Sequence, residues 1–243
     1  MAREILQSRI PDDQREAAAA RLPAMRPVDM ANWLVVDDAY AEQIAYKVHL
    51  METSRDHVCR TLEGAEPAVE ELLDTILANL ADRPDFTVAD TVMCPDGRVV
   101  QIDRSDPFMT LAQLVQEDLC LMEKHGDEHV LTAAILGFPA AWTLAEKIGR
   151  PLTGIHIPVP PYDDNVAKRV QRLFDGIQPG RAIWRANLHT YADPELHHRR
   201  TENDPRPYVD EANFERSERQ TLVRLPKTGA VVFSIHTCMA PKP

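Results

Sequence analysis

Apolar positions in the first half of the chain recur at helical spacing. Segment 66–84, EPAVEELLDTILANLADRP, reads as one amphipathic helix with Pro67 near its start, where proline is tolerated. Its apolar stripe consists of Leu72, Leu73, Ile76, Leu77 and Leu80. Segment 37–62 has the same spacing after Asp37 and Asp38, which suit a helix N-terminus. Both segments are therefore predicted to be helices.

Three further segments favour helices. Segment 106–126, DPFMTLAQLVQEDLCLMEKHG, contains Thr110 as a candidate cap, and segment 139–149, PAAWTLAEKIG, ends on Gly149. Segment 162–180, YDDNVAKRVQRLFDGIQPG, begins with acidic residues that favour a helix N-terminus. We expect a helix in each.

Strand patterns dominate the second half. Segment 91–104, TVMCPDGRVVQIDR, predicts two short strands around a Pro-Asp-Gly turn. Segment 181–192, RAIWRANLHTYA, predicts one strand, and segment 219–240 predicts a hairpin around the turn PKTG. Segment 151–160, PLTGIHIPVP, is also interpreted as a strand, and the polar segment 193–212 as a long loop.

Helices followed by strands indicate an α+β fold, with an antiparallel sheet and helices packed on one face and at one end. Residues 1–27 are predicted to be an N-terminal tail with at most a short helix, which packs on the body or stays loose, because Pro11, Pro23 and Pro27 limit its length. Residues 28–243 are predicted to form a single domain.

Charge and cysteine content narrow the class of protein. The net charge of −11 argues against binding to nucleic acid or an anionic membrane and would suit a cationic substrate or a basic redox partner. Neither a membrane-length apolar run nor a CxxC pair occurs in the sequence, so we expect a cytoplasmic protein with free thiols.

His156 is the first candidate site residue. In a strand, Gly154, His156 and Pro158 would share one face, and the isoleucines beside His156 would face the core. The small neighbours would leave room for a large flat group against the strand. The simpler interpretation is a core histidine bonded to a carbonyl group.

Two later segments add a cation and an anion. Arg185 shares a strand face with Asn187 and His189, which indicates either solvent or a polar pocket where the guanidinium could hold a carboxylate. Glu218 precedes a predicted strand and could act as an acid, a base or an amine-binding group. The simpler interpretation of Glu218 is a surface pair with Arg216 or Arg219.

Other familiar chemistry is weakly indicated. His197 and His198 are adjacent, so their side chains diverge and make a poor chelate. The sequence has no GxGxxG, GKS/T, GxSxG or HExxH motif.

Three blocks taken together resemble the heme-dependent oxidative N-demethylase α-subunit family. They are LVQEDLCLM, the long block from LTAAILGFPAAW through GIHIPVPPYDDNVAKRVQRLFDGIQPGRAIWRANLHTY, and SERQTLVRLPKTGAVVFSI. The resemblance runs from about Met25 to Met239. It implies a PAS-like sheet that binds heme b. It also implies a monooxygenase that uses O2 to remove a methyl group from a small secondary amine such as dimethylamine, giving the primary amine and formaldehyde.

The resemblance also implies roles for individual residues. The histidine of its HxPVP motif falls on His156, the implied axial ligand of the heme iron, with Gly154 and Pro158 letting the porphyrin approach. The arginine of WRANLH falls on Arg185 and the glutamate of SERQTL on Glu218, both in the implied distal pocket. Electrons would come from NADPH through flavin and iron–sulfur reductase or ferredoxin-type subunits in trans, with tetrahydrofolate a candidate acceptor of formaldehyde.

One block departs from the family pattern. Where the family is expected to have a basic residue, often arginine, in FSIxTY, this chain reads FSIHTC, with His236 and Cys238. If that position shapes the pocket, substrate preference would differ.

Two other functions are compatible with the same residues. A non-catalytic heme-binding PAS sensor would use His156 alone, and a non-heme Fe(II) oxygenase would use His156, His189 and Glu218 as ligands. The long family blocks favour the demethylase.

Overall fold

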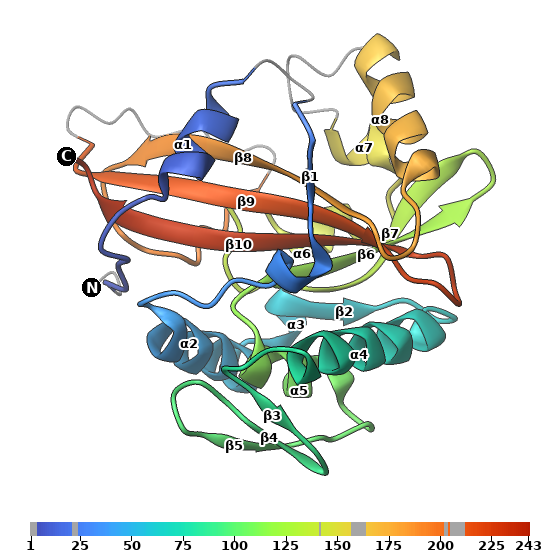
Figure 1. Ribbon diagram of the computed structural model, residues 1–243. Helices are drawn as coiled ribbons and strands as arrows, with labels where there is room; N and C mark the ends of the chain where they lie inside the picture. Colours follow the sequence, from blue (N-terminus) through green and yellow to red (C-terminus); the bar gives the residue numbers. More distant parts are fainter. Residues whose placement is uncertain (1–3, 21–23, 141, 157–163, 202–203, 205–211) are drawn as a thin grey trace.

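A seven-stranded antiparallel sheet forms the centre of the molecule (Figure 1). The computed structural model describes residues 4–20, 24–140, 142–156, 164–201, 204 and 212–243. The strand order is β1-β8-β9-β10-β6-β7-β2. The strands are β1 Arg26–Val28, β2 Cys59–Thr61, β6 Asp118–His125, β7 Glu128–Ile135, β8 Ala182–Tyr191, β9 Phe214–Arg224 and β10 Val231–Pro241. A second sheet contains β3 Thr87–Val88, β4 Thr91–Met93 and β5 Val99–Gln101.

Helices cover the large sheet. They are α1 Asp12–Ala18, α2 Tyr40–Thr53, α3 Arg55–Val58, α4 Glu66–Ala81, α5 Pro107–Leu114, α6 Leu144–Lys147, α7 Leu152–His156 and α8 Asp164–Gly176, with a 3-10 turn at Met30–Asn32. Helices α2 and α4 lie on one side of the sheet, and α7 and α8 lie on the other (Figure 1). This arrangement confirms the predicted α+β class and adds short helices to the second face.

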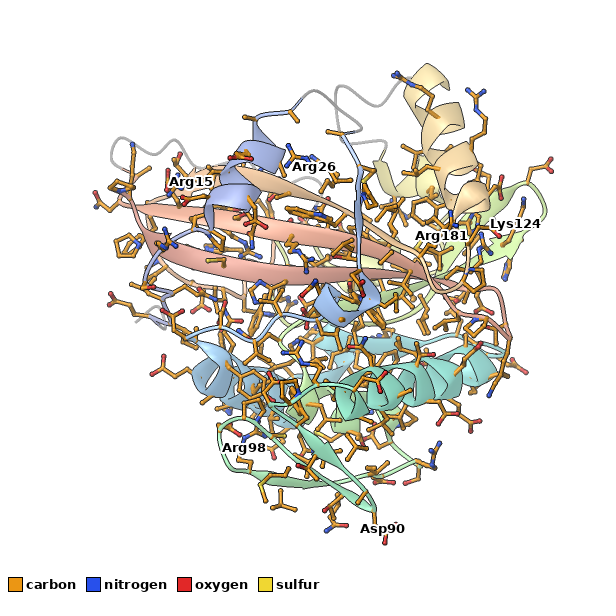
Figure 2. The ribbon with its side chains drawn as sticks, viewed as in Figure 1. Arg15, Arg26, Asp90, Arg98, Lys124 and Arg181 are labelled. Atoms are coloured by element: carbon orange, nitrogen blue, oxygen red, sulfur yellow. The ribbon has the colours of Figure 1, made fainter. Side chains whose placement is uncertain are left out.

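The two faces of the sheet follow from strand alternation. Register pairs Arg185 with Gln220 and Asn187 with Glu218, so these four side chains share one face, here called the Glu218 face. Arg219 lies on the opposite face, here called the Arg219 face. The main apolar core packs between the Arg219 face and α2, α4 and α5, and Leu72, Leu73 and Ile76 are fully buried in it. Charged side chains such as Lys124, Arg181 and Asp90 lie at the periphery (Figure 2).

Several predicted elements are confirmed. Helix α4 begins one residue before Pro67 and carries the predicted stripe, and α8 occupies most of segment 162–180. The hairpin β9–β10 closes through the turn PKTG, in which Gly229 has a φ of 75°, a conformation that favours glycine. The two short strands around the Pro-Asp-Gly turn are β4 and β5.

The helix predicted over residues 106–126 is wrong in its second half. Helix α5 ends at Leu114, and Asp118–His125 form strand β6 between β10 and β7. Both faces of this central strand are covered, so its apolar run does not alternate, which hid the strand. The cap of α5 is Asp106, whose carboxylate accepts from the Met109 amide at 3.2 Å, and Thr110 is buried within the helix. The helix predicted over 139–149 shrinks to the single turn α6.

The strand predicted over residues 151–160 is also wrong where the structure describes it. Leu152–His156 form the short helix α7, in which the Ile155 amide donates to the carbonyl of Pro151 at 2.9 Å. Proline is well tolerated at the start of a helix, and five residues are too few for a periodicity to separate a helix from a strand. Gly154 and His156 therefore do not share a strand face, and the open space predicted beside His156 from strand alternation has no basis.

The N-terminal residues pack on the sheet. Ala17 of α1 contacts Trp184 and Ala186 in one small apolar cluster, and Arg15 forms an ion pair with Glu215 of β9. The Gln7 amide donates to the carbonyl of Met239 at 2.8 Å. Of the alternatives that the sequence left open, the packed helix is the observed one.

The four cysteines are free thiols, three of them buried. Among the residues that the structure describes, none of the helices has the length and apolarity needed to cross a bilayer.

Candidate functional site

The Glu218 face brings together two of the predicted site residues. Strand β8 carries Arg185 and Asn187, and the neighbouring β9 carries Glu218 and Gln220 on the same face. These residues, with Arg216, form a polar cluster that sequence alternation predicted in part.

Three donors surround the Glu218 carboxylate, which is 7% exposed. Asn187 Nδ2 donates to Oε2 at 2.9 Å, and Gln220 Nε2 donates to the same oxygen at 3.3 Å. Arg216 Nη2 lies 3.3 Å from Oε1 and forms an ion pair with it. Asn187 also accepts from the Glu218 backbone amide at 2.9 Å, so it holds both the backbone and the carboxylate of Glu218.

A buried network of hydrogen bonds and one ion pair holds Arg216 in place. Its side chain is 1% exposed and donates to the carbonyls of Leu196, at 3.0 Å, and Phe138, at 2.5 Å. The Phe138 amide in turn donates to the Asp118 carboxylate at 2.7 Å, and Asp118 pairs with the buried Lys47 at 3.5 Å. The Glu218 carboxylate is therefore held by a partner that cannot move independently of the core.

Arg185 is half-buried and faces Glu218 through Gln220. Its Nη1 donates to Gln220 Oε1 at 3.1 Å. Burial lowers the pKa of Arg185, and the charge of Glu218 opposes that change. The amide of Gln220 thus accepts from the cation and donates to the anion.

Apolar side chains flank this cluster on the same face. Leu222 is buried, and the half-buried Ile183 and Phe233 pack with it in one group that includes Leu152 and Ile155 of α7. Half-buried apolar surface with a few fixed polar groups beside it is typical of a binding site for a flat cofactor. The apolar and charged side chains on this face are thus of the kinds that the apolar body and the charged edge of a heme would need.

His156 ends α7, which packs next to this apolar surface. Its imidazole, and all of Pro158, lie outside the part of the chain that the structure describes. Gly154 lies inside α7, where an added Cβ would meet Pro151 Cδ at 3.4 Å. The nearest neighbours of Gly154 thus belong to its own turn.

Two other candidate histidines lie on opposite faces of the sheet. His236 pairs in register with Arg219 and so lies on the Arg219 face, where its Nε2 is 3.2 Å from Asp37 Oδ2. Cys238 lies on that face too, so the departure from the family pattern does not alter the Glu218 cluster directly. His189 pairs in register with Arg216, so it shares the Glu218 face with Arg185 and Asn187, and its side chain is exposed near the end of β8.

The adjacent histidines point to separate partners. His197 Nδ1 is 2.6 Å from the Gly137 carbonyl, and His198 Nε2 is 3.4 Å from Asp193. Within the described residues, no three His, Cys, Asp or Glu side chains are grouped as a metal site would require.

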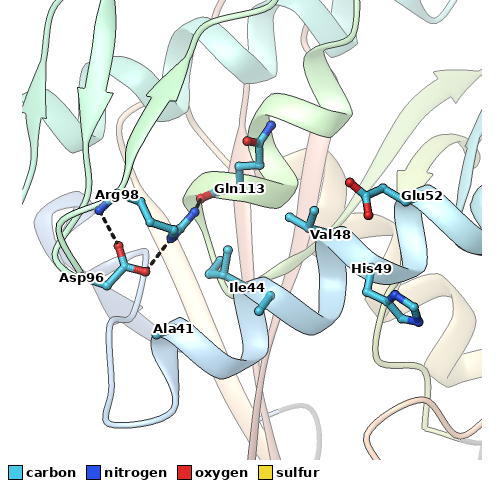
Figure 3. Close-up of a pocket in the computed structure, with 9 residues that line it drawn as sticks. Ala41, Ile44, Val48, His49, Glu52, Asp96, Arg98 and Gln113 are labelled. Atoms are coloured by element: carbon cyan, nitrogen blue, oxygen red, sulfur yellow. Dashed lines mark hydrogen bonds and ion pairs between the residues drawn. The ribbon is translucent and has the colours of Figure 1, made fainter.

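A cavity of about 410 Å³ lies on the helical side of the molecule (Figure 3). It is lined by α2, α5 and the β4–β5 turn, where Arg98 donates to Asp96 at 2.6 Å and to the Gln113 carbonyl at 3.0 Å. Because α2 packs against the Arg219 face, the sheet separates this cavity from the Glu218 cluster.

Residues 24–242 match the family model described as "Haem-dependent oxidative N-demethylase, alpha subunit-like". The chain belongs to this family. The match covers nearly the whole chain and confirms the resemblance seen in the sequence. No curated protein matches the chain.

Membership of the N-demethylase α-subunit-like family gives the Glu218 cluster its context, because the family's name implies dependence on heme and the presence of other subunits. Sequence analysis missed Asn187 and Gln220 as partners of Glu218. Their signal was the register of β8 against β9, which a single sequence does not contain. The sequence also suggested that Arg216 is a surface residue, whereas Arg216 is buried.

Proposed function

We propose that this chain is the heme-carrying subunit of an oxidative N-demethylase that acts on a small secondary amine such as dimethylamine. The observation that carries the proposal is the placement of Glu218 and Arg185 on one sheet face, beside half-buried apolar surface, in a member of this family. In the overall reaction the C–N bond to the methyl carbon breaks, and the nitrogen gains a proton. One atom of O2 ends in formaldehyde and the other in water, with two electrons and two protons supplied from outside.

Heme b would be held by His156 through its iron, with Gly154 and Pro158 two residues away on either side in the sequence, and with Leu222, Ile183 and Phe233 as apolar contacts. When bound, the heme supplies the chemistry of O2 activation, and the protein supplies binding, orientation and electrostatics.

Glu218 would bind the amine or accept its proton. A carboxylate offers about four acceptor positions. Asn187 and Gln220 both donate to Oε2 and Arg216 donates to Oε1, so an acceptor position on Oε1 is left for an ammonium group. Because these donors fix the carboxylate, it needs little reorganisation to orient the N-methyl group.

Arg185 would place a positive charge on the same sheet face as Glu218, separated from it by the Gln220 amide. Its half-buried guanidinium would donate to an anionic group, such as a carboxylate, at the edge of the site.

Electrons would come from NADPH through separate flavin and iron–sulfur subunits, which is consistent with the α-subunit designation of the family. Tetrahydrofolate would be the acceptor of formaldehyde, and the free thiols suit a cytoplasmic setting.

The non-heme alternative requires His156, His189 and Glu218 to meet at one iron ion. Glu218 and His189 lie on the same sheet face, but Glu218 already forms an ion pair with Arg216, and the name of the family favours heme over non-heme iron.

Heme loading tests the cofactor assignment. The purified protein incubated with heme should show an intense Soret band, and His156→Ala should lose or greatly weaken it. The matched variant His125→Ala, at the exposed end of β6, should keep it. An unchanged heme spectrum in His156→Ala would remove His156 as the ligand, and a wild-type protein that binds iron but no heme would favour the non-heme alternative. Amine-dependent turnover then separates the demethylase from a heme sensor.

A further inference from the structure

The charges of the polar cluster do not cancel. Arg216 and Glu218 form an ion pair at 3.3 Å, whereas the only hydrogen-bond partner of the Arg185 side chain among the described residues is the neutral amide of Gln220. In the part of the chain that the structure describes, the cluster therefore has one cation more than it has anions.

Gln220 keeps the extra cation apart from Glu218. Its Oε1 accepts from Arg185 at 3.1 Å while its Nε2 donates to Glu218 at 3.3 Å, so each end of the amide faces the charge that it complements. A guanidinium has five N–H donors, and this contact uses one of them. Arg185 is half-buried, so water does not fully solvate its charge, and this burial lowers the pKa of the side chain.

A simple alkylammonium ion fits only half of this site. Its positive charge would be attracted by Glu218 and repelled by Arg185, and like charges cost most where the surroundings are partly desolvated. A molecule with an ammonium and a carboxylate would satisfy both residues, because the guanidinium fork matches a carboxylate.

We infer that Arg185 is a carboxylate-binding residue and that the substrate of this chain is a secondary amine that carries its own carboxylate, an N-methyl amino acid. This inference names the substrate class of the proposed function. It rests on the proposed function for the N-demethylation reaction, whereas the binding of a carboxylate to Arg185 is independent of it. A carboxylate at Arg185 has two sources, the substrate or a heme propionate, and an experiment can separate them.

The test measures binding to the heme-loaded full chain without reductant. Titration calorimetry would give dissociation constants for N-methylglycine and for dimethylamine. The wild-type protein should bind N-methylglycine about tenfold or more tightly than dimethylamine, because hydrogen bonds to charged groups are worth at least that factor. Arg185→Gln should remove this preference and leave dimethylamine binding unchanged or stronger.

Two variants serve as controls. Arg185→Lys keeps the charge but loses the fork, and should recover only part of the preference. Arg181→Gln removes an exposed charge one residue before β8 and should bind both ligands as the wild type does (Figure 2).

Protein loaded with heme whose propionates are esterified tests the other source. If Arg185 held a propionate, esterification and Arg185→Gln would each weaken heme binding to the same extent, and the two changes together would have no further effect. In that case Arg185→Gln would not selectively weaken the binding of N-methylglycine. That result, or equal affinity of the wild type for both ligands, overturns the inference. Arg185-dependent binding of N-methylglycine without any formaldehyde production would leave the inference standing and overturn the proposed reaction.

Discussion

Neighbouring residues on β9 point to opposite faces of the sheet. Glu218 faces the polar cluster, and its neighbour Arg219 faces the opposite layer, where its guanidinium donates to the carbonyls of Trp33, at 2.9 Å, and Asn32, at 2.7 Å. The sequence suggested either Arg216 or Arg219 as a surface partner of Glu218. Alternation selects Arg216, and burial makes the pair part of the core.

Glu218→Gln tests the role of the carboxylate. The variant should keep its heme spectrum and lose about hundredfold or more in kcat/KM for the amine, the scale of a lost acid–base or charge contact. Steady-state formaldehyde assays would measure this loss.

Glu215→Gln is the matched control for that experiment, because Glu215 lies on the same strand but on the other face, paired with Arg15. It should retain near wild-type turnover. Full activity in Glu218→Gln would remove Glu218 from the mechanism.

Asp37 gives the fold a defined acid sensitivity. Burial alone would raise the pKa of Asp37, but the contact with His236 and the donors Gln116 and Gln7 lower it to about 2 from 3.8. Because the unfolded chain binds the proton more readily, this group stabilises the fold above about pH 4, and that stabilisation is lost as the pH falls towards 2.

Asp37→Asn should therefore be less stable than the wild type near neutral pH by roughly 2 kcal/mol, and the difference should shrink between about pH 4 and pH 2. Urea unfolding at a series of pH values would measure it. A difference that is independent of pH in this range would contradict the assignment.

At the scale of elements, the sequence predicted those whose pattern is long and one-sided. Helix α4 has sixteen residues with one buried stripe, and β8 alternates clearly between its faces. Strand β6 was missed because its apolar run is buried on both sides, and α7 because one helical turn shows no period. Likewise, the sequence could place Glu218 and Arg185 on strands, but only strand register could add Asn187 and Gln220.

The β9–β10 hairpin depends on one distant carboxylate. Glu71 of α4 is 5% exposed and accepts from the backbone amides of Lys227, at 2.6 Å, and Thr228, at 2.7 Å. These bonds tie the turn PKTG to the helical layer.

Glu71→Gln would turn an amide group towards one of those donors and should lower the free energy of unfolding by about 2 kcal/mol. The exposed neighbour Glu70 offers a matched control, because Glu70→Gln should change the free energy of unfolding by less than about 0.5 kcal/mol. Thermal and urea unfolding of the two variants would compare them, and equal stability would show that the turn closes without Glu71.

At the scale of the whole molecule, the site is supported from the opposite layer. Lys47 of α2 pairs with Asp118 at the start of β6, Asp118 holds the Phe138 amide, and Phe138 in turn accepts from Arg216, the partner of Glu218. A continuous buried path thus links the helical layer to the polar cluster on the other face. Such a path keeps the cluster rigid, which suits orientation of a small substrate.

Formaldehyde release is the decisive measurement for the proposed heme-dependent oxidative N-demethylation. Heme-loaded protein with NADPH and a flavin and iron–sulfur reductase would be supplied with dimethylamine or N-methylglycine in the presence of O2. One formaldehyde and one primary amine should form for each secondary amine consumed, with no product when heme or O2 is left out. A heme that is fully loaded and reduced, yet yields no formaldehyde from either amine, would contradict it.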